Sequence, residues 1–510
     1  MARSPRARSR WCLPALLVLL AGCLPGSRAS GPPPSTAAAK GPKPNFVVVL
    51  ADDLDSSLMP YLPRVNRLLT AHGTTLDRYY VNLSWCCPSR ATLLLGEYAH
   101  NTGIWSNNPP NGGFAEFQKR GEEDSTLATW LESAGYRTGL FGKYLNGYPE
   151  QAPGTPATYV PPGWSTWVSP VAGSPFQGFD YTLNENGRLV HRPPSAKTYF
   201  TDVLSREAQK FVGAADERPF FAYIAPTVPH PPAVPAPRHK NLFPGLKAPR
   251  DPSYDLADMT GKPAELRRLP RLTAADEKAG DALFRRRVQS MQAVDEMVEA
   301  LVSTLRTAGR LNDTYLVFTS DNGFHIGSYR LAPGKNTGYE NDVRVPFVVR
   351  GPGVPPGRVS HALTGNVDVA PTLADLAGAW TPPLADGRSL RALLHGAPAS
   401  GRRAYLLEHG TARGTHPAPA YDGPGVPPHP YTPATRDEAY LPAFAGLRTE
   451  RYLYLEYVTG ERELYDMAAD PYQLRNLAAA DPAASRLSAL LAALRACAGA
   501  ACRRAESEAP

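Results

Sequence analysis

Two apolar runs rich in β-branched residues constrain the fold of this chain more than any other feature. Residues 45–50 read NFVVVL, and residues 314–319 read TYLVFT. Runs that are apolar at nearly every position are typical of strands buried on both faces, as in a parallel sheet. Helical patterns separate the predicted strands, and strands that alternate with helices predict an α/β fold. We therefore expect a large, mostly parallel sheet flanked by helices on both faces.

Other segments of the chain fit this architecture. Helices are expected at about 60–71, 88–95, 125–134, 200–213, 281–307 and 368–377, and strands at 137–141, 219–225 and 345–350. After residue 380, two tyrosine-rich runs at 451–457 and 461–465 flank Thr459-Gly460, which predicts a hairpin. A last helix is expected at about 482–496. These patterns predict a large domain over residues 44–380 and a small antiparallel C-terminal subdomain over residues 381–510.

Oxygen-bearing side chains follow both apolar runs. Asp52 and Asp53 come after the first run, and Asp321 and Asn322 come after the second. Ligands of open α/β sheets bind at the carboxyl ends of strands, where hard oxygen donors select Ca²⁺ or Mg²⁺ over zinc. Side chains alternate along a strand, so Asp52 and Asp53 can share a metal only if the chain bends there. The alternative is that each pair forms a turn or caps a helix.

The run Cys86-Cys87-Pro88-Ser89-Arg90, followed by ATLLLG, is the most distinctive short motif. By itself it could be a buried cysteine pair beside a turn proline. The run resembles the signature of type I sulfatases, Cys-x-Pro-Ser-Arg-x-x-x-Leu-Thr-Gly. In that family the first cysteine is oxidised to formylglycine by a formylglycine-generating enzyme. The resemblance therefore implies that Cys86 is the modified residue, and that the fold is the alkaline-phosphatase-like sulfatase fold with residues 44–380 as the catalytic domain.

The same resemblance implies a set of metal ligands. Sulfatases bind one Ca²⁺ with an Asp-Asp pair after the first strand, an Asp-Asn pair after a later strand, and the formylglycine itself. The matching positions here are Asp52, Asp53, Asp321, Asn322 and Cys86.

Four cationic residues match positions that hold the sulfate group in the family. A sulfate ester needs positive charge around it, because negative charge develops on the leaving oxygen as the S–O bond breaks. Arg90 would orient the formylglycine hydrate, and Lys143, His230 and Lys335 would neutralise the sulfate oxygens. Taken singly, each is more easily explained as a surface cation or a loop histidine.

Two further residues indicate a branch of the family. Many sulfatases read Gly-Lys-Trp-His where this chain reads Gly142-Lys143-Tyr144-Leu145-Asn146, which resembles the N-acetylglucosamine-6-sulfatase and heparan endosulfatase branch. Asn146 would supply a neutral hydrogen bond to the substrate. His325, three residues past Asn322, could protonate the leaving alkoxide, or it could be a packing histidine on its loop.

The branch implies hydrolysis of a 6-O-sulfate on N-acetylglucosamine or a related sulfated glycan, as in glycosaminoglycan degradation. Alternatives are an arylsulfatase, a phosphate or phosphonate monoester hydrolase of the same superfamily, and a non-catalytic glycan-binding lipoprotein. The net charge of +7 suits an anionic substrate, although a solvated basic surface explains it equally well. No run of Lys and Arg outside the N-terminal segment indicates nucleic-acid binding.

The N-terminal segment predicts export. Arginines precede an apolar stretch, Leu13–Leu20, that is too short to span a bilayer, and Leu20-Ala21-Gly22-Cys23 resembles a bacterial lipobox. We expect residues 1–23 to be a signal peptide, with Cys23 lipidated or simply near an ordinary secretory cleavage site. Residues 24–43 are rich in Pro, Ser, Gly and Ala and predict a disordered linker. The protein would then lie outside the cell, either attached to the membrane only through a lipid at its N-terminus or secreted.

The six cysteines of the chain divide into groups with different expected fates. Cys12 leaves with the signal peptide, and Cys86 and Cys87 belong to the motif. In an exported protein the remaining pair, Cys497 and Cys502, is expected to form a small disulfide loop. The segment 410–440 is full of Pro and Gly and predicts an irregular loop.

Overall fold

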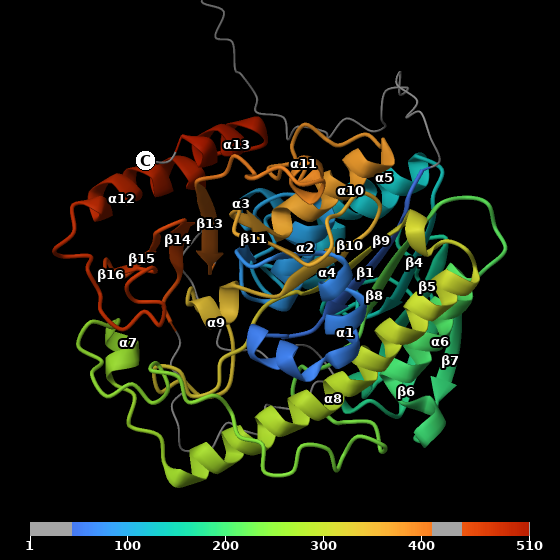
Figure 1. The fold of residues 1–510 in the computed structure, drawn as a ribbon, viewed down its shortest axis with the longest axis horizontal. Helices are drawn as coiled ribbons and strands as arrows, with labels where there is room; N and C mark the ends of the chain where they lie inside the picture. The colour runs from blue at the N-terminus through green and yellow to red at the C-terminus, as the bar shows by residue number, and fades with distance from the viewer. Residues whose placement is uncertain (1–42, 411–440, 509–510) are drawn as a thin grey trace, which may run out of the picture. The chain divides into compact units, whose positions relative to one another are not determined.

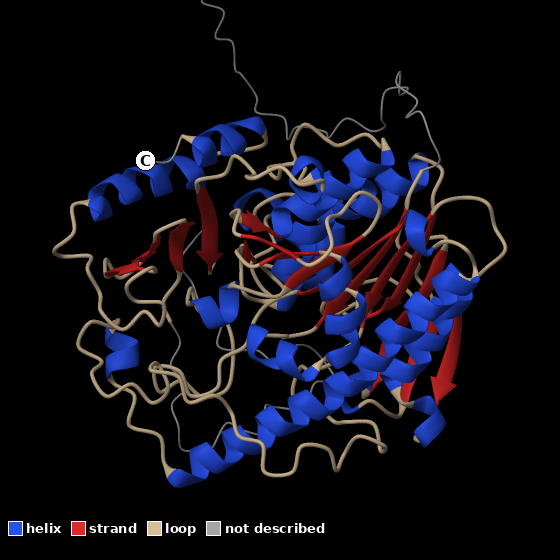
Figure 2. Ribbon diagram, viewed as in Figure 1, coloured by secondary structure: helices blue, strands red, loops and turns tan. Residues whose placement is uncertain are grey.

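A ten-stranded sheet lies at the centre of the part that the computed structural model describes, residues 43–410 and 441–508. The order of the strands is β11-β2-β10-β9-β1-β8-β4-β5-β6-β7. Helices lie on both faces of this sheet (Figures 1 and 2). The predicted signal peptide with Cys23, and all of the predicted linker except Lys43, lie outside the described residues.

The strands of the large sheet are, in chain order, β1 (Asn45–Ala51), β2 (Thr74–Leu76), β4 (Arg137–Gly142), β5 (Thr166–Gly173), β6 (Tyr181–Glu185), β7 (Arg188–Arg192), β8 (Phe220–Ala225), β9 (Thr314–Ser320), β10 (Phe347–Arg350) and β11 (Arg358–Ser360). Within it, β6 and β10 run against both of their neighbours, and the other strands share one direction. The prediction of a mostly parallel sheet is confirmed.

Strands β1 and β9 pair in parallel at the centre of the sheet. Every residue of both strands is buried, as the continuous apolar runs predicted. The register joins Asn45 to Thr314 at one end and Ala51 to Ser320 at the other. The carboxyl ends of the two strands therefore lie side by side, and the acidic residues that follow them start from adjacent backbone positions.

Alternating side chains of β1 pack into two separate cores. Phe46, Val48 and Leu50 belong to the core formed with α2 (Cys86–Leu95), α5 (Leu127–Ser133) and α10 (Val369–Ala377). Val47, Val49 and Ala51 belong to the core formed with α1 (Pro63–Leu68), α6 (Phe200–Val212) and α8 (Ala274–Thr307). Figure 1 shows these two sets of helices on opposite faces of the sheet. The sheet is thus covered on both sides, which explains why its central strands are apolar at nearly every position.

Two predicted helices differ from the observed ones. The helix expected at about 60–71 is broken into a 3₁₀ turn (Ser56–Tyr61), α1 and a second 3₁₀ turn (Thr70–His72). Pro60 and Pro63 cause the break, because proline disfavours a helical conformation in the residue before it. Helix α8 begins at Ala274 instead of about residue 281, because Thr273 and Asp276 form a capping box at its start.

A small antiparallel sheet forms the centre of the C-terminal part, as predicted, and it has four strands, two more than the expected hairpin. Its strands are β13 (Ala404–His409), β14 (Phe444–Thr449), β15 (Tyr452–Tyr457) and β16 (Arg462–Asp466), and the helices after it are α12 (Ala483–Arg495) and α13 (Ala500–Ser507). β15 and β16 pair as the expected hairpin. Apart from Gly410, the loop predicted at 410–440 lies outside the described residues.

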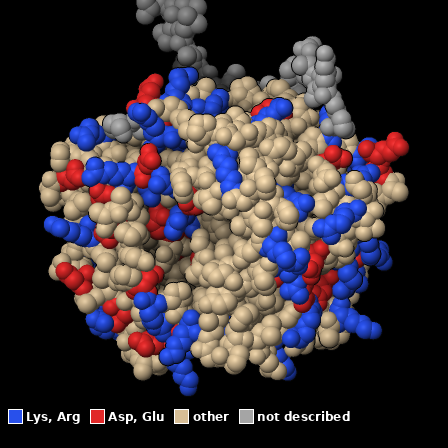
Figure 3. Space-filling view, viewed as in Figure 1, with Lys and Arg blue, Asp and Glu red and all other residues tan. Residues whose placement is uncertain are grey.

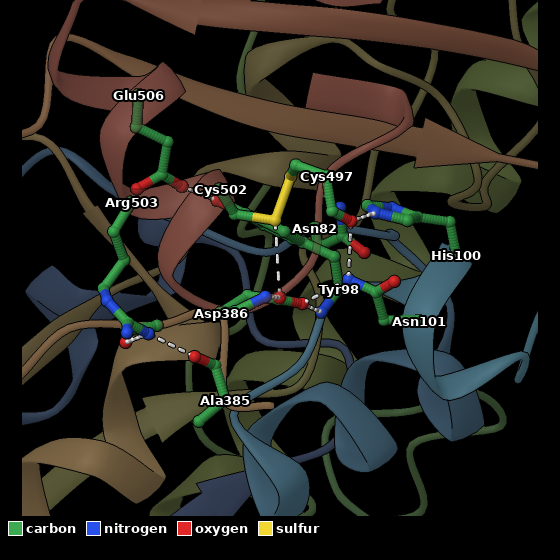
Figure 4. The surroundings of a disulfide bond; sticks show 12 residues. Asn82, Tyr98, His100, Asn101, Ala385, Asp386, Cys497, Cys502, Arg503 and Glu506 are labelled. Atoms are coloured by element: carbon green, nitrogen blue, oxygen red, sulfur yellow. Dashed lines mark hydrogen bonds between the residues drawn. A yellow bond between two sulfur atoms is a disulfide. The ribbon is translucent and has the colours of Figure 1, made fainter. Parts of the chain in front are cut away.

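A disulfide joins Cys497 to Cys502 between α12 and α13. His100 Nε2 lies 2.9 Å from the Cys497 carbonyl oxygen (Figure 4). The Gly499 N–H donates to Asp386 Oδ1 at 2.6 Å. His100 belongs to α3 (Ala99–Thr102), the helix that follows α2. The disulfide loop therefore contacts α3, the helix that follows the Cys86 motif in the chain.

Acidic and basic side chains are mixed over the face of the molecule seen in Figure 3. No helix within residues 43–410 and 441–508 is both long and apolar enough to cross a membrane.

Candidate active site

The chain bends sharply where β1 ends. Asp53 has a positive φ of 68°, a left-handed conformation that a regular strand does not contain. The bend allows both carboxylates to approach one cluster: Asp52 Oδ1 lies 3.5 Å from the Cys86 sulfur, and Asp53 Oδ1 lies 2.7 Å from Lys335 Nζ, which itself contacts that sulfur. Both aspartates are fully buried. Asp52 and Asp53 were expected to share a metal only if the chain bends between them, and the chain does bend there.

The residues after β9 are fastened to the same bend. Asp321 Oδ1 accepts hydrogen bonds from the Asp53 N–H at 3.1 Å and the Asn322 N–H at 2.8 Å. The Asn322 side-chain amide donates to Asp53 Oδ1 at 2.7 Å. These short loops are held together through side chains that were predicted as metal ligands from the sequence.

Cys86 and Cys87 face different surroundings at the start of α2. Both are buried and neither is in a disulfide. The Cys86 sulfur lies 2.9 Å from Lys335 Nζ, among charged groups, whereas Cys87 packs in the apolar core. Burial raises the pKa of the Cys86 thiol well above its usual value although Lys143 and Lys335 act in the opposite direction, and burial raises that of Cys87 to about 12. Of the two cysteines, Cys86 is thus the one whose sulfur contacts charged side chains.

The four predicted cations surround these carboxylates. Lys143 Nζ lies 2.8 Å from Asp52 Oδ2, Arg90 Nε lies 2.9 Å from Asp321 Oδ2, and His230 Nε2 lies 3.7 Å from Asp53 Oδ2. Burial raises the pKa of Asp52, but Lys143, Arg90 and His230 outweigh burial and hold that pKa below its usual value. Asp52 is accordingly a carboxylate, the form that binds a cation.

The donor set fits a hard divalent cation. Asp53 Oδ2 and Asn322 Oδ1 are buried and accept no hydrogen bond from any described residue. Buried oxygens without a partner are costly unless another group satisfies them. Asp52, Asp53, Cys86 and His230 also place ligand atoms within 4.8 Å of one another. Since most of the available donors are carboxylate and amide oxygens, Ca²⁺ or Mg²⁺ suits the cluster better than a soft metal does.

His325 and Asn146 are also buried. His325 Nδ1 lies 2.9 Å from Asp342 Oδ1, and the backbone of His325 pairs with that of Gly334, next to Lys335. The carbonyl oxygen of Asn146 accepts a hydrogen bond from the Phe114 N–H at 2.7 Å, at the start of α4 (Gly113–Lys119). The roles expected for both side chains stay predictions.

Two residues near the cluster were not predicted. Arg287 of α8 is fully buried, donates to Asp55 Oδ2 at 2.8 Å and to the Asp53 carbonyl, and lies 4.3 Å from the Phe324 ring. An arginine within the apolar stripe of α8 was the available signal. Phe176 packs its ring 4.7 Å from the His230 ring and 5.2 Å from Lys143 Nζ. It lies in a loop of the β5–β6 hairpin, where the sequence offers no comparable signal.

Comparisons with known proteins agree with this geometry. The family model described as Sulfatase matches residues 44–379. The N-acetylglucosamine-6-sulfatase of Homo sapiens is 35% identical over 511 residues, which cover 96% of this chain and 90% of that protein. The extracellular sulfatase SULF-1 homolog of Drosophila melanogaster is 36% identical over 363 residues, covering 70% of this chain and 32% of the fly protein. The chain thus spans about a third of the length of that fly relative.

A solved structure of a protein in complex with its substrate, D-glucosamine-2-N,6-O-disulfate, has a TM-score of 0.71 to this chain at 23% identity. The alignment covers 88% of this chain and 97% of the other. At this identity the likeness concerns the fold.

Proposed function

The chain belongs to the sulfatase family, and we propose that it hydrolyses sulfate esters with a nucleophile made from Cys86. Its fold is the alkaline-phosphatase-like sulfatase fold. The observation that carries the proposal is the place of the Cys86 sulfur, 3.5 Å from Asp52 Oδ1 and 2.9 Å from Lys335 Nζ. In the mature enzyme the hydrate oxygens of formylglycine would take the place of this sulfur.

A formylglycine hydrate supplies one hydroxyl that attacks sulfur and a second hydroxyl whose deprotonation later expels sulfate. Asp52, Asp53, Asp321 and Asn322 would hold Ca²⁺, whose charge favours the ionised hydroxyl. Conversion of Cys86 requires a formylglycine-generating enzyme as a partner during maturation.

The cationic side chains would bind and orient the sulfate group. Lys143, His230 and Lys335 surround the Cys86 position and would neutralise the sulfate oxygens. Arg90 donates to Asp321 Oδ2 and to the Lys143 carbonyl, both at 2.9 Å, so it links the metal ligands to the loop of Lys143. His230 or His325 would protonate the leaving alkoxide.

The proposed substrate is a 6-O-sulfate on N-acetylglucosamine or a related sulfated glycan. The likeness to the human N-acetylglucosamine-6-sulfatase over most of both chains supports this choice, as does the Lys143-Tyr144-Leu145-Asn146 run. We further propose that the protein acts outside the cell, as the fly relative's name says of that protein. Attachment through a lipid on Cys23 is part of the same proposal.

Substitution of Cys86 tests the nucleophile, and Cys87→Ala serves as the matched control. Cys86→Ala should lose multiple turnover while keeping its melting temperature, and Cys87→Ala should keep activity because that side chain only packs in the core. The intact mass of the peptide containing residues 86–90 should show formylglycine in the wild type. Undiminished turnover by Cys86→Ala, or an unmodified thiol in fully active protein, would contradict the proposal.

A panel of sulfate and phosphate esters tests the substrate. We expect sulfate release from N-acetylglucosamine 6-sulfate and little release from the 3-sulfate of the same sugar. Hydrolysis confined to aryl sulfates, or faster hydrolysis of sugar phosphates than sugar sulfates, would overturn the proposed substrate class.

A further inference from the structure

Asp342 is a fully buried carboxylate whose only ionic partner among the described residues is a histidine. It lies in the short helix α9 (Glu340–Val343). Its two oxygens lie 2.9 and 3.0 Å from His325 Nδ1. Neither Lys nor Arg of the described chain forms an ion pair with it. Loss of the histidine would leave this buried carboxylate without an ionic partner among the described residues, which is costly.

Thr337 holds this carboxylate from the other side. Its backbone N–H donates to Asp342 Oδ2 at 3.0 Å, and its hydroxyl donates to the same oxygen at 2.7 Å. Two donors on one oxygen fix the rotation of the carboxylate. The orientation of Asp342 is therefore set before any substrate binds.

The opposite nitrogen of His325 remains available. Nε2 of His325 has no hydrogen-bond partner among residues 43–410 and 441–508, although the side chain is only 4% exposed. A Cβ on Gly334 would lie 3.4 Å from this nitrogen, so the glycine leaves the space beside it open. The next residue is Lys335, whose Nζ lies 2.9 Å from the Cys86 sulfur.

We propose that Asp342 is a positioning residue that holds His325 as the proton donor to the leaving alcohol. The inference rests on the proposed function, because it assigns the acid of that ester cleavage. Acceptance of the Nδ1–H by Asp342 fixes the tautomer and the orientation of the imidazole ring. As the S–O bond breaks, its electron pair stays on the alcohol oxygen, and the proton of Nε2 moves to that oxygen. Neutral His325 keeps its proton on Nδ1 and regains the other from water.

A double-mutant cycle on N-acetylglucosamine 6-sulfate, or on whichever sugar sulfate the wild type hydrolyses, tests the pair. His325→Asn and Asp342→Asn should each lower kcat by about 10²–10⁴-fold, the range of general acid catalysis. The double variant should be no slower than the slower single variant, because one residue acts through the other. Losses that multiply, or an unaffected His325→Asn, would overturn the inference.

The leaving group provides a readout that a purely structural role would not move. A nitrophenyl sulfate releases a stable phenolate that needs little protonation, so both variants should lose less than about tenfold with it. Equal losses on sugar and nitrophenyl esters would contradict the inference. If the wild type accepts only sugar sulfates, the double-mutant cycle decides alone.

Two further variants guard against misfolding. Asp342→Glu keeps a carboxylate and should recover part of the sugar sulfatase activity that Asp342→Asn loses. Thr337→Val removes one of the two donors to Asp342. It should lower kcat by less than either His325→Asn or Asp342→Asn does. If Asp342→Asn does not fold, Asp342→Glu takes its place. A lower kcat on the sugar ester but not on the nitrophenyl ester would then support the inference, and equal losses of kcat on both esters would oppose it. A wild type that hydrolyses no sulfate ester would instead refute the proposed function.

Discussion

At the scale of single residues, Arg287 connects loops that carry three different parts of the candidate site. Its guanidinium donates to the carbonyl of Asp53 and to Asp55, reaches the carbonyl of Pro229 at 3.4 Å, and packs on Phe324. Pro229 precedes His230, and Phe324 precedes His325. A planar guanidinium can serve several acceptors in one plane, which a lysine cannot do. Arg287 thus supports the left-handed conformation of Asp53.

Arg287→Lys should weaken Ca²⁺ binding. We expect a loss of affinity of about 10–100-fold, as for other residues that orient metal ligands. The measurement is calorimetric titration with Ca²⁺, together with the rise in melting temperature that Ca²⁺ causes in each protein. Arg306→Lys, an exposed change on the same helix, is the control. Equal Ca²⁺ affinity in Arg287→Lys and the wild type would show that Arg287 has only a packing role.

The residue scale also shows how far the sequence could predict the site. Cys86 and the oxygen-bearing residues were found because a short motif and two strand ends carry them. Arg287 and Asp342 were not predicted, because neither belongs to a motif. The acceptors of Arg287, Asp53 and Asp55, come from a distant segment, whereas the partners of Asp342 lie 17 and 5 residues before it in the chain. Contacts of that kind exist only once α8 and α9 have packed against the site.

At the scale of elements, the C-terminal sheet holds the loop of Lys335. Arg448 of β14 pairs with Glu340 at 2.7 Å. Lys262 lies 4.2 Å from the Tyr339 ring, donates to the Tyr465 hydroxyl at 2.8 Å and lies 3.6 Å from Glu463 of β16. Burial lowers the pKa of Lys262 to about 8, although Glu463 opposes the shift.

Lys262→Met should destabilise the protein by about 3 kcal/mol at pH 7, because Glu463 would remain buried without its cation. Adding Glu463→Gln should recover part of that loss. Denaturant unfolding measures both changes, and the exposed Lys278→Met should shift the free energy of unfolding by less than about 0.5 kcal/mol. If Lys262→Met changes the free energy of unfolding no more than this control does, the contacts of Lys262 contribute little to holding the loop of Lys335.

Element prediction succeeded for the central strands of the large sheet and failed at its edge, and it also missed the buried strands β13 and β14. Strands β1 and β9 were found because both of their faces are covered. The edge strand β7 has mostly exposed side chains, so its sequence, RLVHR, carries no apolar run to mark it. The adjacent strands β5 and β6 were missed as well.

At the scale of the whole molecule, the disulfide loop joins the C-terminus to the segment after the Cys86 motif. His100 contacts both the Cys497 carbonyl and Glu408 of β13, with Nδ1 3.0 Å from Glu408 Oε1. Burial lowers the pKa of His100, but the hydrogen bond and charge of Glu408, the Cys497 carbonyl and the charge of Asp386 together outweigh burial and raise it to about 9. Burial also raises the pKa of the nearby Asp386, to about 6.

This arrangement predicts that His100 stabilises the fold most below about pH 6.5, its unfolded value, and ceases to do so as pH rises through about 9. His100→Gln should therefore be less stable than the wild type by up to about 3 kcal/mol near pH 6, and the difference should shrink toward pH 10. Melting curves of both proteins across this range provide the test. A gap that stays constant or widens with pH would contradict the prediction.

The register of β1 against β9 has a consequence for how the chain can change. The backbone pairing runs from Asn45 opposite Thr314 to Ala51 opposite Ser320. This pairing sets the distance between the acidic residues that follow β1 and those that follow β9. One residue inserted into either strand would shift its cluster by about 3.3 Å and turn its side chains to the other face. Insertions into surface connections would leave that spacing intact. The protein can therefore gain or lose whole loops during evolution, while neither of these strands tolerates a change of a single residue in length.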